Sequence, residues 1–439
     1  MNRAWKITRT VFLTALGAGL LLSCAAVRFS EDISAYENKI QALERKVQAD
    51  SANASALRDL GVIYFQTQHY AQAKDYLQRA FALDKRDAKT TFYLGMTYEF
   101  QDKIRLAVLF HERYKEVSRL SLYRRLMEGR YHRLTTEILR QEARQLLAEI
   151  DKLPLDRMSP QAIAVLPLRY QGADKKYAPL GKGISEMLIG DLGQVRQLKL
   201  LERIRLQALL DEMTLAQHPA FDQSTAPSYG KLMSAGRIIA GTYNVLPQEK
   251  LQVDVLSWNI LSQQYPAAAT QSDLLQNLFR MEKDLVFKFI AGMGIELTPQ
   301  EREKIQFVPT KNLQAFLAYC QGLESEDGGQ FNAAATFYQQ AKQLDPGFEL
   351  AGSKAETAQS LSEAGGNKEE AVTVAQNADP PISPGAPTSQ ADLITDRLRN
   401  LGENVGSNFV PGRDNREPVE EADRAFGELG KPPAPPPRP

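Results

Sequence analysis

A repeat of 34 residues is the feature that most restricts how this chain can fold. Shifting the sequence by 34 residues aligns Leu60-Gly61 with Leu94-Gly95, Tyr64 with Tyr98, and Ala73 with Ala107. A fixed period of this length predicts a supersecondary unit that buries its apolar face against its neighbours. Within each unit the apolar residues follow helical spacing, which predicts two antiparallel helices, with small residues such as Gly61 and Ala73 where the helices approach closely.

A third unit with the same spacings begins more than 200 residues later. Its aligned residues are Gly322, Ala334, Tyr338 and Ala341, and Asp345-Pro346 ends its second helix because proline cannot continue a helix. The pattern resembles the tetratricopeptide repeat, L-G-x2-Y followed by A-x3-F. In the second unit, His111 and Tyr114 stand where a large apolar and a small residue are expected. The resemblance implies a groove that binds a partner segment, and a purely structural spacer is the alternative.

The N-terminus has the order of a secretory signal. Basic residues at Arg3, Lys6 and Arg9 precede an uncharged segment, residues 10–22, which is too short for the roughly 20 residues of a membrane-spanning helix. The following Leu21-Leu22-Ser23-Cys24 resembles the bacterial lipobox, which implies removal of residues 1–23 and a covalent lipid on Cys24. Ala25 after the cysteine implies, by the same resemblance, the periplasmic face of the outer membrane. A buried cysteine in an uncleaved helix is the alternative.

Composition and patterning predict an α+β multidomain protein in which tetratricopeptide-type helical hairpins flank an α/β sandwich. The formal net charge is +0, which gives no global field for nucleic acid or anionic surfaces. After the signal peptide at 1–23, we expect an anchor and leader helix (24–51), two repeats (52–121), an arginine-rich connecting helix (122–159), an α/β domain (160–297), a third repeat (310–360) and a disordered Pro-rich tail (365–439).

The connecting helix carries an unusual number of arginines. They are Arg119, Arg124, Arg125, Arg130, Arg133, Arg140 and Arg144. One interpretation is a cationic face for lipid phosphates or an acidic partner. The other, which we favour, is a solvated face paired along the helix with Glu128, Glu137 and Glu142.

The α/β domain is predicted from a change of pattern after Pro160. Residues 162–168 read as a buried strand, followed by a helix at 180–195, a strand at 198–203 and a helix at 204–215. The remaining elements are a short helix at 229–234, a hairpin of strands at 237–246 and 251–261, and a terminal helix at 272–293.

Several phrases of this domain resemble the CsgG-like domain, which is related to the N-terminal domain of TolB and to periplasmic activators of peptidoglycan synthases. The residues that match its motifs are Gly181, Gly183, Ser185, Glu202, Arg203, Glu212 and Gly241. For Glu202 and Arg203 we favour local hydrogen bonds at a strand end and a helix start. A phosphate-binding loop at Gly181-Lys182-Gly183 is disfavoured because Glu186 stands where the G-x-G-x-x-G motif needs glycine.

No catalytic or metal-binding pattern accompanies these motifs. The four histidines lie in no H-E-x-x-H or Cys-His grouping, so we expect no catalysis, no metal and no cofactor beyond the lipid on Cys24. We expect a scaffold or adaptor for assembly, export or regulation of a cell-envelope structure. Its partners would be envelope or secretion proteins and the membrane through the lipid, with a possible homo-oligomer and no nucleic acid, because the chain is exported. The alternative is a subunit of an oligomeric CsgG-type secretion channel. Such a channel builds its pore from long hairpins whose strands each need about 9–11 alternating residues, whereas the loops at 169–179 and 216–229 are short, polar and unpatterned.

Overall fold

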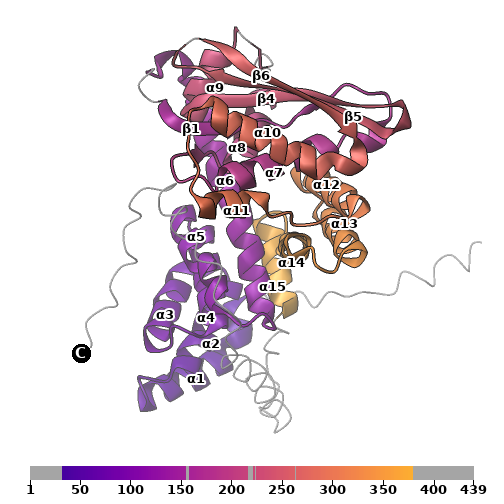
Figure 1. The fold of residues 1–439 in the computed structure, drawn as a ribbon. Helices are drawn as coiled ribbons and strands as arrows, with labels where there is room; N and C mark the ends of the chain where they lie inside the picture. The colour runs from indigo at the N-terminus through magenta and orange to yellow at the C-terminus, as the bar shows by residue number, and fades with distance from the viewer. Residues whose placement is uncertain (1–31, 155–157, 216–220, 223, 263, 379–439) are drawn as a thin grey trace, which may run out of the picture.

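The computed structural model describes residues 32–154, 158–215, 221–222, 224–262 and 264–378. Cys24, the signal sequence and the predicted tail beyond residue 378 lie outside the described residues. Within the described ranges, none of the helices combines the length and the apolar character needed to cross a membrane. Figure 1 shows a mixed sheet with helices packed on it, above an array made only of helices.

The N-terminal half of the array consists of helical hairpins. Its helices are α1 (Glu37–Ala49), α2 (Ala54–Gln66), α3 (Tyr70–Leu83), α4 (Ala88–Phe100), α5 (Ile104–Glu112) and the long α6 (Leu122–Ala148). Side-chain caps start two of them, because the Asn53 carboxamide oxygen accepts from the Ala56 N–H (2.9 Å) and the Asp87 carboxylate accepts from the Thr90 N–H (3.3 Å). The predicted hairpins α2–α3 and α4–α5 are therefore present.

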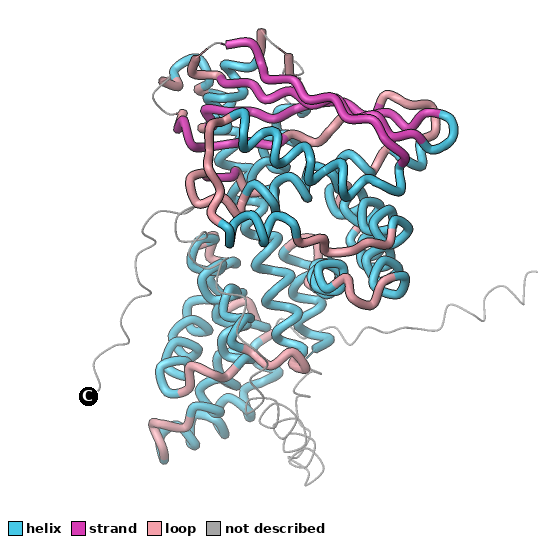
Figure 2. Tube along the Cα trace, in the orientation of Figure 1, coloured by secondary structure: helices cyan, strands magenta, loops and turns pink. Residues whose placement is uncertain are grey.

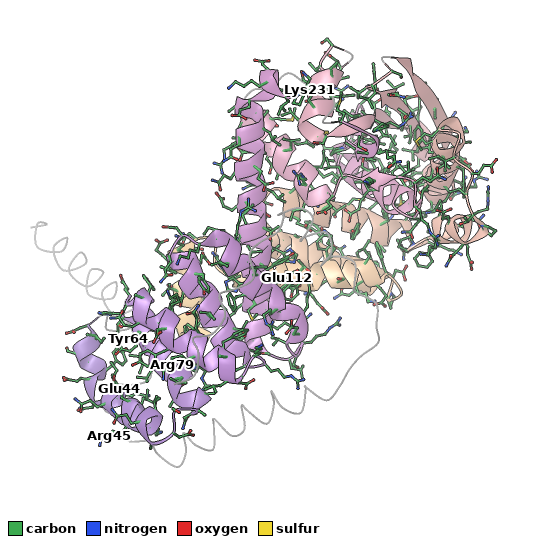
Figure 3. All side chains as sticks on the ribbon, turned by 90° about the vertical axis from the view of Figure 1, so that its left-hand side faces the viewer. Glu44, Arg45, Tyr64, Arg79, Glu112 and Lys231 are labelled. Carbon is green, nitrogen blue, oxygen red and sulfur yellow. The ribbon has the colours of Figure 1, made fainter. Side chains whose placement is uncertain are left out.

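Each repeat packs a glycine of its first helix against a large residue 16 positions later on its second helix. The pairs are Gly61 with Leu77, Gly95 with His111, and Gly322 with Tyr338. A Cβ atom at Gly61 would lie 2.5 Å from Leu77 Cγ, and one at Gly95 would lie 2.7 Å from His111 Cε1. The predicted packing residues Leu60, Ala73, Leu94, Tyr98, Ala107, Ala334 and Ala341 are buried beside these pairs. Tyr64 is half-buried and stacks on Tyr76. Figure 3 shows Tyr64 on the side of the repeats that carries Glu44 of α1.

The C-terminal half of the array returns to the N-terminal half. Its helices are α12 (Leu313–Asp327), α13 (Phe331–Leu344), α14 (Glu349–Glu363) and α15 (Lys368–Ala378). Helix α14 packs directly along α6, so the array runs from α2 through α6 to α14, α13 and α12. At the α6–α14 contact, a Cβ atom on Gly129 would collide with the Ser360 carbonyl oxygen. The sheet domain is therefore an insertion between two helical halves that touch each other.

Most arginines of α6 contact other elements of the fold instead of the predicted carboxylates of α6. Arg130 is buried in an ion pair with Glu99, and Arg133 donates to the Leu361 carbonyl. Arg140 pairs with Asp211 of the sheet domain (2.9 Å). Of the predicted carboxylate partners, Glu137 pairs with Arg144 (3.4 Å). Glu128 instead accepts hydrogen bonds from Thr357 and Ser360. Glu142 pairs with Arg105 and Arg205. These side chains point towards neighbouring helices because α6 has helices on several sides.

The sheet has six strands. They are β1 (Ser159–Val165), β2 (Arg169–Tyr170), β3 (Lys199–Leu200), β4 (Ala235–Leu246), β5 (Lys250–Asn259) and β6 (Gln264–Leu274). Their order is β3-β1-β4-β5-β6, with β2 also paired to β4. Strand β1 pairs in parallel with β3 and β4, and β2 pairs in parallel with β4. Strand β5 pairs antiparallel with β4 and β6. This pairing confirms the predicted β4–β5 hairpin and the mixed α+β class. Figure 2 shows the long β4–β6 strands extending beyond the parallel part.

Both faces of the parallel part are covered by helices. Alternate residues of β1 point to opposite faces, so Ile163 and Val165 join one core and Ala164 and Leu166 the other. The first core contains α7 (Leu180–Leu192), α10 (Leu278–Gly292) and residues of α12 and α13; the second contains α8 (Arg203–Leu215), α9 (Ala226–Met233) and the end of α6. A short α11 (Pro299–Gln306), with a capping box between Thr298 and Glu301, connects α10 to α12.

Two predicted segments differ from the structure. The terminal helix was predicted at 272–293, but β6 occupies residues 264–274 and α10 begins only at Leu278. This alanine-rich strand with Pro266 has a weak strand signal, and it forms because β5 provides a long pairing partner and the sheet edge tolerates proline. The predicted disordered tail was placed from residue 365, but residues 368–378 form α15, in which Ala371 and Ala375 are buried.

We predict that Gly129→Val lowers the free energy of unfolding by about 1–3 kcal/mol, since the new side chain would push α14 away from α6. Urea denaturation measures this change. Gly190→Ala is the matched control, because a Cβ atom at this helical glycine meets nothing within 4 Å. It should be neutral or add about 0.5–1 kcal/mol through helix propensity. Equal stability of Gly129→Val and wild type would contradict the close helix contact.

We also predict that His111 makes the protein less stable as the pH falls. Burial, and then the nearby Arg130, lower the pKa of His111 to about 3, and neither ring nitrogen has a hydrogen-bond partner among the described residues. The unfolded chain therefore binds this proton at a higher pH than the folded chain, so stability is lost as the pH drops from about 6.5 towards 3.

His111→Leu should remove this dependence. Relative to wild type, the variant should gain up to about 1.4 kcal/mol per pH unit between pH 6 and 4, as measured by urea denaturation at each pH. His132, whose partial burial lowers its pKa to about 4, stays in both proteins and cancels in the comparison. Parallel stability curves over this range would show that His111 does not titrate on unfolding.

Candidate functional site

The predicted motif residues at the start of α7 hold the end of β1 in place. The Ser185 hydroxyl donates to the Leu166 carbonyl (3.0 Å) and accepts from the Leu168 N–H (3.2 Å). The Gly181 N–H donates to the Tyr243 hydroxyl (3.0 Å), which itself donates to the carbonyls of Tyr177 and Ala178 (2.7 Å each). The Gly181 N–H is thus already bound within the protein, which argues against a phosphate at this position.

The second glycine of the motif brings α7 against the third repeat. A Cβ atom on Gly183 would collide with the Cys320 sulfur and lie 2.9 Å from the Phe316 ring. Burial raises the pKa of the Cys320 thiol, so this cysteine stays protonated and acts as a small packed residue. Gly183 therefore allows the sheet domain to dock closely on α12.

A charged cluster lies at this docking contact, and we call it the junction cluster. It consists of Lys182, Glu186, Arg203, Glu326, Asp327 and Lys354. Arg203 contacts three carboxylates, those of Asp327 (2.5 Å), Glu186 (3.3 Å) and Glu326 (3.6 Å). Its predicted role in local hydrogen bonds was wrong, because as the first residue of α8 its side chain reaches the end of α12 instead.

The other cations complete the cluster from both sides. Lys182 lies 2.9 Å from Asp327 and 2.9 Å from the more exposed Glu324, while Lys354 of α14 lies 3.1 Å from Glu326. Although burial raises it, Lys354, Arg203 and a hydrogen bond from Tyr338 lower the pKa of Glu326 to about 2. The contacts of Glu326 thus contribute stability only while its carboxylate is ionised.

A pocket of about 100 Å³ opens next to the junction cluster. Its wall is mainly apolar, with rings from Phe279, Phe316, Tyr319 and Phe348. Glu186 lines it and accepts a hydrogen bond from the Tyr319 hydroxyl (2.9 Å). The pocket can hold a small apolar group beside a carboxylate, in the way that ligand pockets combine apolar walls with a few polar groups.

One side of the pocket carries a buried charge group. Lys283 forms an ion pair with Asp191, and both line the pocket. Glu282 lies behind them, with its carboxylate 3.3 Å from the Lys283 ammonium. Burial, and then the Asp191 carboxylate, raise the pKa of Glu282 well above its usual value. The polar part of the pocket lining thus consists of the Lys283–Asp191 pair, Glu186 and Thr310.

The remaining predicted motif residues lie away from the pocket. Gly241 pairs with Val255 across β4 and β5, where a side chain would collide with the Asp254 carbonyl. Glu212 is buried on α8, 3.8 Å from Arg144 of α6. Glu202 immediately precedes α8, next to Arg203. The motif therefore supports the fold at several points, and only Gly183 and Arg203 reach the junction.

Sequence reasoning missed most of the junction residues. Glu324, Glu326 and Asp327 form an acidic run at the end of the first helix of the third repeat, and this run is the signal that could have indicated them. Of their partners, Lys182 and Arg203 lie more than 100 positions before this run, and Lys354 lies 28 positions after Glu326. The fold brings these charges together.

Comparison with protein families agrees with this architecture. The family described as "Curli production assembly/transport component CsgG" matches residues 155–245, which contain β1 to β4 and helices α7 to α9. The family "Tetratricopeptide repeat" matches residues 54–87, which contain α2 and α3. The chain combines a CsgG-like domain with tetratricopeptide repeats. We found no match to the chain among curated proteins. The CsgG-like domain thus extends beyond the matched residues through β5, β6 and α10 in the same sheet and core.

We predict that Glu326→Gln lowers the free energy of unfolding by on the order of 3 kcal/mol at neutral pH, because Arg203 and Lys354 lose a charged partner. Since the pKa of Glu326 is about 2 in the folded protein, the difference should shrink as the pH falls from about 4.5 towards 2. Denaturation at several pH values measures both effects. Glu324→Gln is the control, because its more exposed pair with Lys182 should contribute less than about 1 kcal/mol.

Proposed function

We propose that this protein is an outer-membrane-anchored periplasmic lipoprotein that acts as a non-catalytic scaffold or adaptor in assembly, export or regulation of a cell-envelope structure. The observation that carries the proposal is the close packing of the CsgG-like domain against the tetratricopeptide repeats. Helix α6 touches the domain on one side, and α12 with the junction cluster touches it on another. Such an arrangement presents two protein-binding surfaces at a fixed distance from each other.

Chemistry and family resemblance support the same proposal. Tetratricopeptide repeats bind protein segments in grooves between helices, and the CsgG family is described as a curli assembly or transport component. The partners would accordingly be envelope or secretion proteins, with the membrane contacted through the lipid on Cys24 and no contact with nucleic acid. We propose no cofactor and no catalysis, because the sequence contains no recognised catalytic or metal-binding motif.

The lipid anchor can be tested with the two cysteines of the chain. We predict that metabolic labelling with an alkyne fatty acid marks the wild type and Cys320→Ala, whereas Cys24→Ala carries no label. Cys320→Ala is a matched control because it removes a thiol that is buried against Gly183. Label on Cys24→Ala would exclude the lipobox as the attachment site.

The scaffold itself can be tested by crosslinking in whole cells. With an affinity tag at the C-terminus, mass spectrometry should recover envelope-assembly or peptidoglycan-synthesis proteins with wild type and Cys320→Ala but far less with Cys24→Ala. Crosslinks chiefly between copies of this chain, in high-order rings, would instead favour the alternative of a secretion-channel subunit.

A further inference from the structure

Helix α15 packs on an aromatic surface of the N-terminal repeats. We call this surface the α15 groove and define it by Phe65 of α2, Tyr93 and Phe100 of α4, Asp102 and Arg130. The three rings form its floor, with the Phe65 ring edge-on to Tyr93 (5.4 Å) and to Phe100 (5.6 Å). These rings contact each other without any residue of α15, so the floor belongs to the repeats themselves.

Helix α15 meets the groove through two buried alanines, the partly buried Val372 and Val374, and two polar contacts, and Gly365 before the helix makes a third. Ala371 and Ala375, one helical turn apart, are buried in the same cluster as the aromatic floor. The Tyr93 hydroxyl donates to the Ala375 carbonyl (3.4 Å), and Arg130 donates to the Gly365 carbonyl (3.1 Å). Lys368 pairs with Asp102 (2.5 Å) and lies over the Phe100 ring. The contacting pattern of α15 is therefore Lys-x-x-Ala-x-x-x-Ala.

The attachment of α15 rests on few contacts. Like the shorter α5 and α11, it has fewer than the roughly 12–15 residues at which an isolated helix becomes even marginally stable in water, so it depends on packing. Its ion pair is exposed, with 83% of the Asp102 side chain accessible, and such pairs contribute about 0–1 kcal/mol. Gly365 precedes it with φ of +76°, a conformation that allows the chain to turn sharply after α14. Its helical state thus depends on the groove.

We propose that the α15 groove is a helix-binding site, that α15 is its internal ligand, and that it accepts a partner helix with the pattern Lys-x-x-Ala-x-x-x-Ala. Binding of the partner requires α15 to leave, so the chain covers its own site until a competitor is present. Small residues at i and i+4 let a helix backbone approach the three rings, and the lysine meets Asp102. The proposal concerns the groove alone and does not depend on the location or pathway proposed above.

Binding of a synthetic peptide tests this proposal on purified protein. The probe is a fluorescein-labelled peptide of residues 366–378, and the proteins are the chain from residue 25 onwards and the same chain ended at residue 364. The peptide should bind the shortened protein. It should bind the longer protein about tenfold or more weakly, because the tethered α15 competes at an effective concentration in the millimolar range. No binding to the folded shortened protein, or equal binding to both, would overturn the proposal.

Two peptide variants test which side of the helix contacts the groove, and one protein variant tests whether α15 covers it. Ala371→Glu in the peptide should abolish binding, since this residue is buried, whereas Thr373→Glu should leave it unchanged, since Thr373 is exposed. If the shortened protein fails to fold, Ala371→Glu in the longer protein should expel α15 and expose the groove to the unmodified peptide. Absence of binding there would also contradict the proposal.

Amide hydrogen exchange distinguishes whether α15 is a displaceable ligand or a permanent structural helix. In the unmodified protein, the amides of α15 should exchange at least about tenfold faster than those of α4, because α15 opens without unfolding the repeats. Addition of excess free peptide should accelerate exchange in α15 and leave α4 unchanged. Protection of α15 equal to that of α4 would make it a structural part of the array and refute the proposal.

Discussion

The close approach of α6 and α14 at Gly129 determines how the rest of the molecule is arranged. A residue with a side chain at this position would collide with the Ser360 carbonyl, so glycine permits the two backbones to touch. The contact joins helical segments that are separated in sequence by the entire sheet domain. Because these halves meet directly, the array is continuous, and the domain can be an insertion without breaking the array. The turn after α14, and with it the position of α15, follows from the same contact.

Buried charges fix the register of this contact. Arg130 lies next to Gly129, pairs with Glu99 of α4 and donates to the Gly365 carbonyl beyond α14. A buried ion pair contributes little net stability, because desolvation offsets the attraction, but losing one partner leaves a costly unpaired charge. We infer that Arg130 selects one alignment of three helices instead of strengthening their association. The junction cluster does the same for the sheet domain, since Arg203 fits only where three carboxylates converge.

Local patterns predicted the helices of the array well, and they failed where partners distant in sequence decide the structure. The 34-residue period located Gly61 and Gly95, and the same spacing located Gly322, because close helix packing needs a small residue in every unit. Strand β6 was missed because its alanine-rich sequence forms a strand only when β5 is beside it. Helix α15 was assigned to the disordered tail because its few apolar residues are small. Arg203 was misjudged because two of its three carboxylate partners, Glu326 and Asp327, lie more than 100 positions away.

The placement of charge also indicates what kind of partner the repeats can bind. Although the chain has 53 basic and 53 acidic residues, many of those on α6, α8, α12 and α14 already pair with each other at internal contacts. Charges used in this way are not free to attract a partner over long distances. Affinity must then come from apolar surface, and the three rings of the α15 groove supply it next to a single exposed aspartate. On the proposal made for the α15 groove, a partner would therefore be selected more by the shape of a small-residue helix than by its net charge.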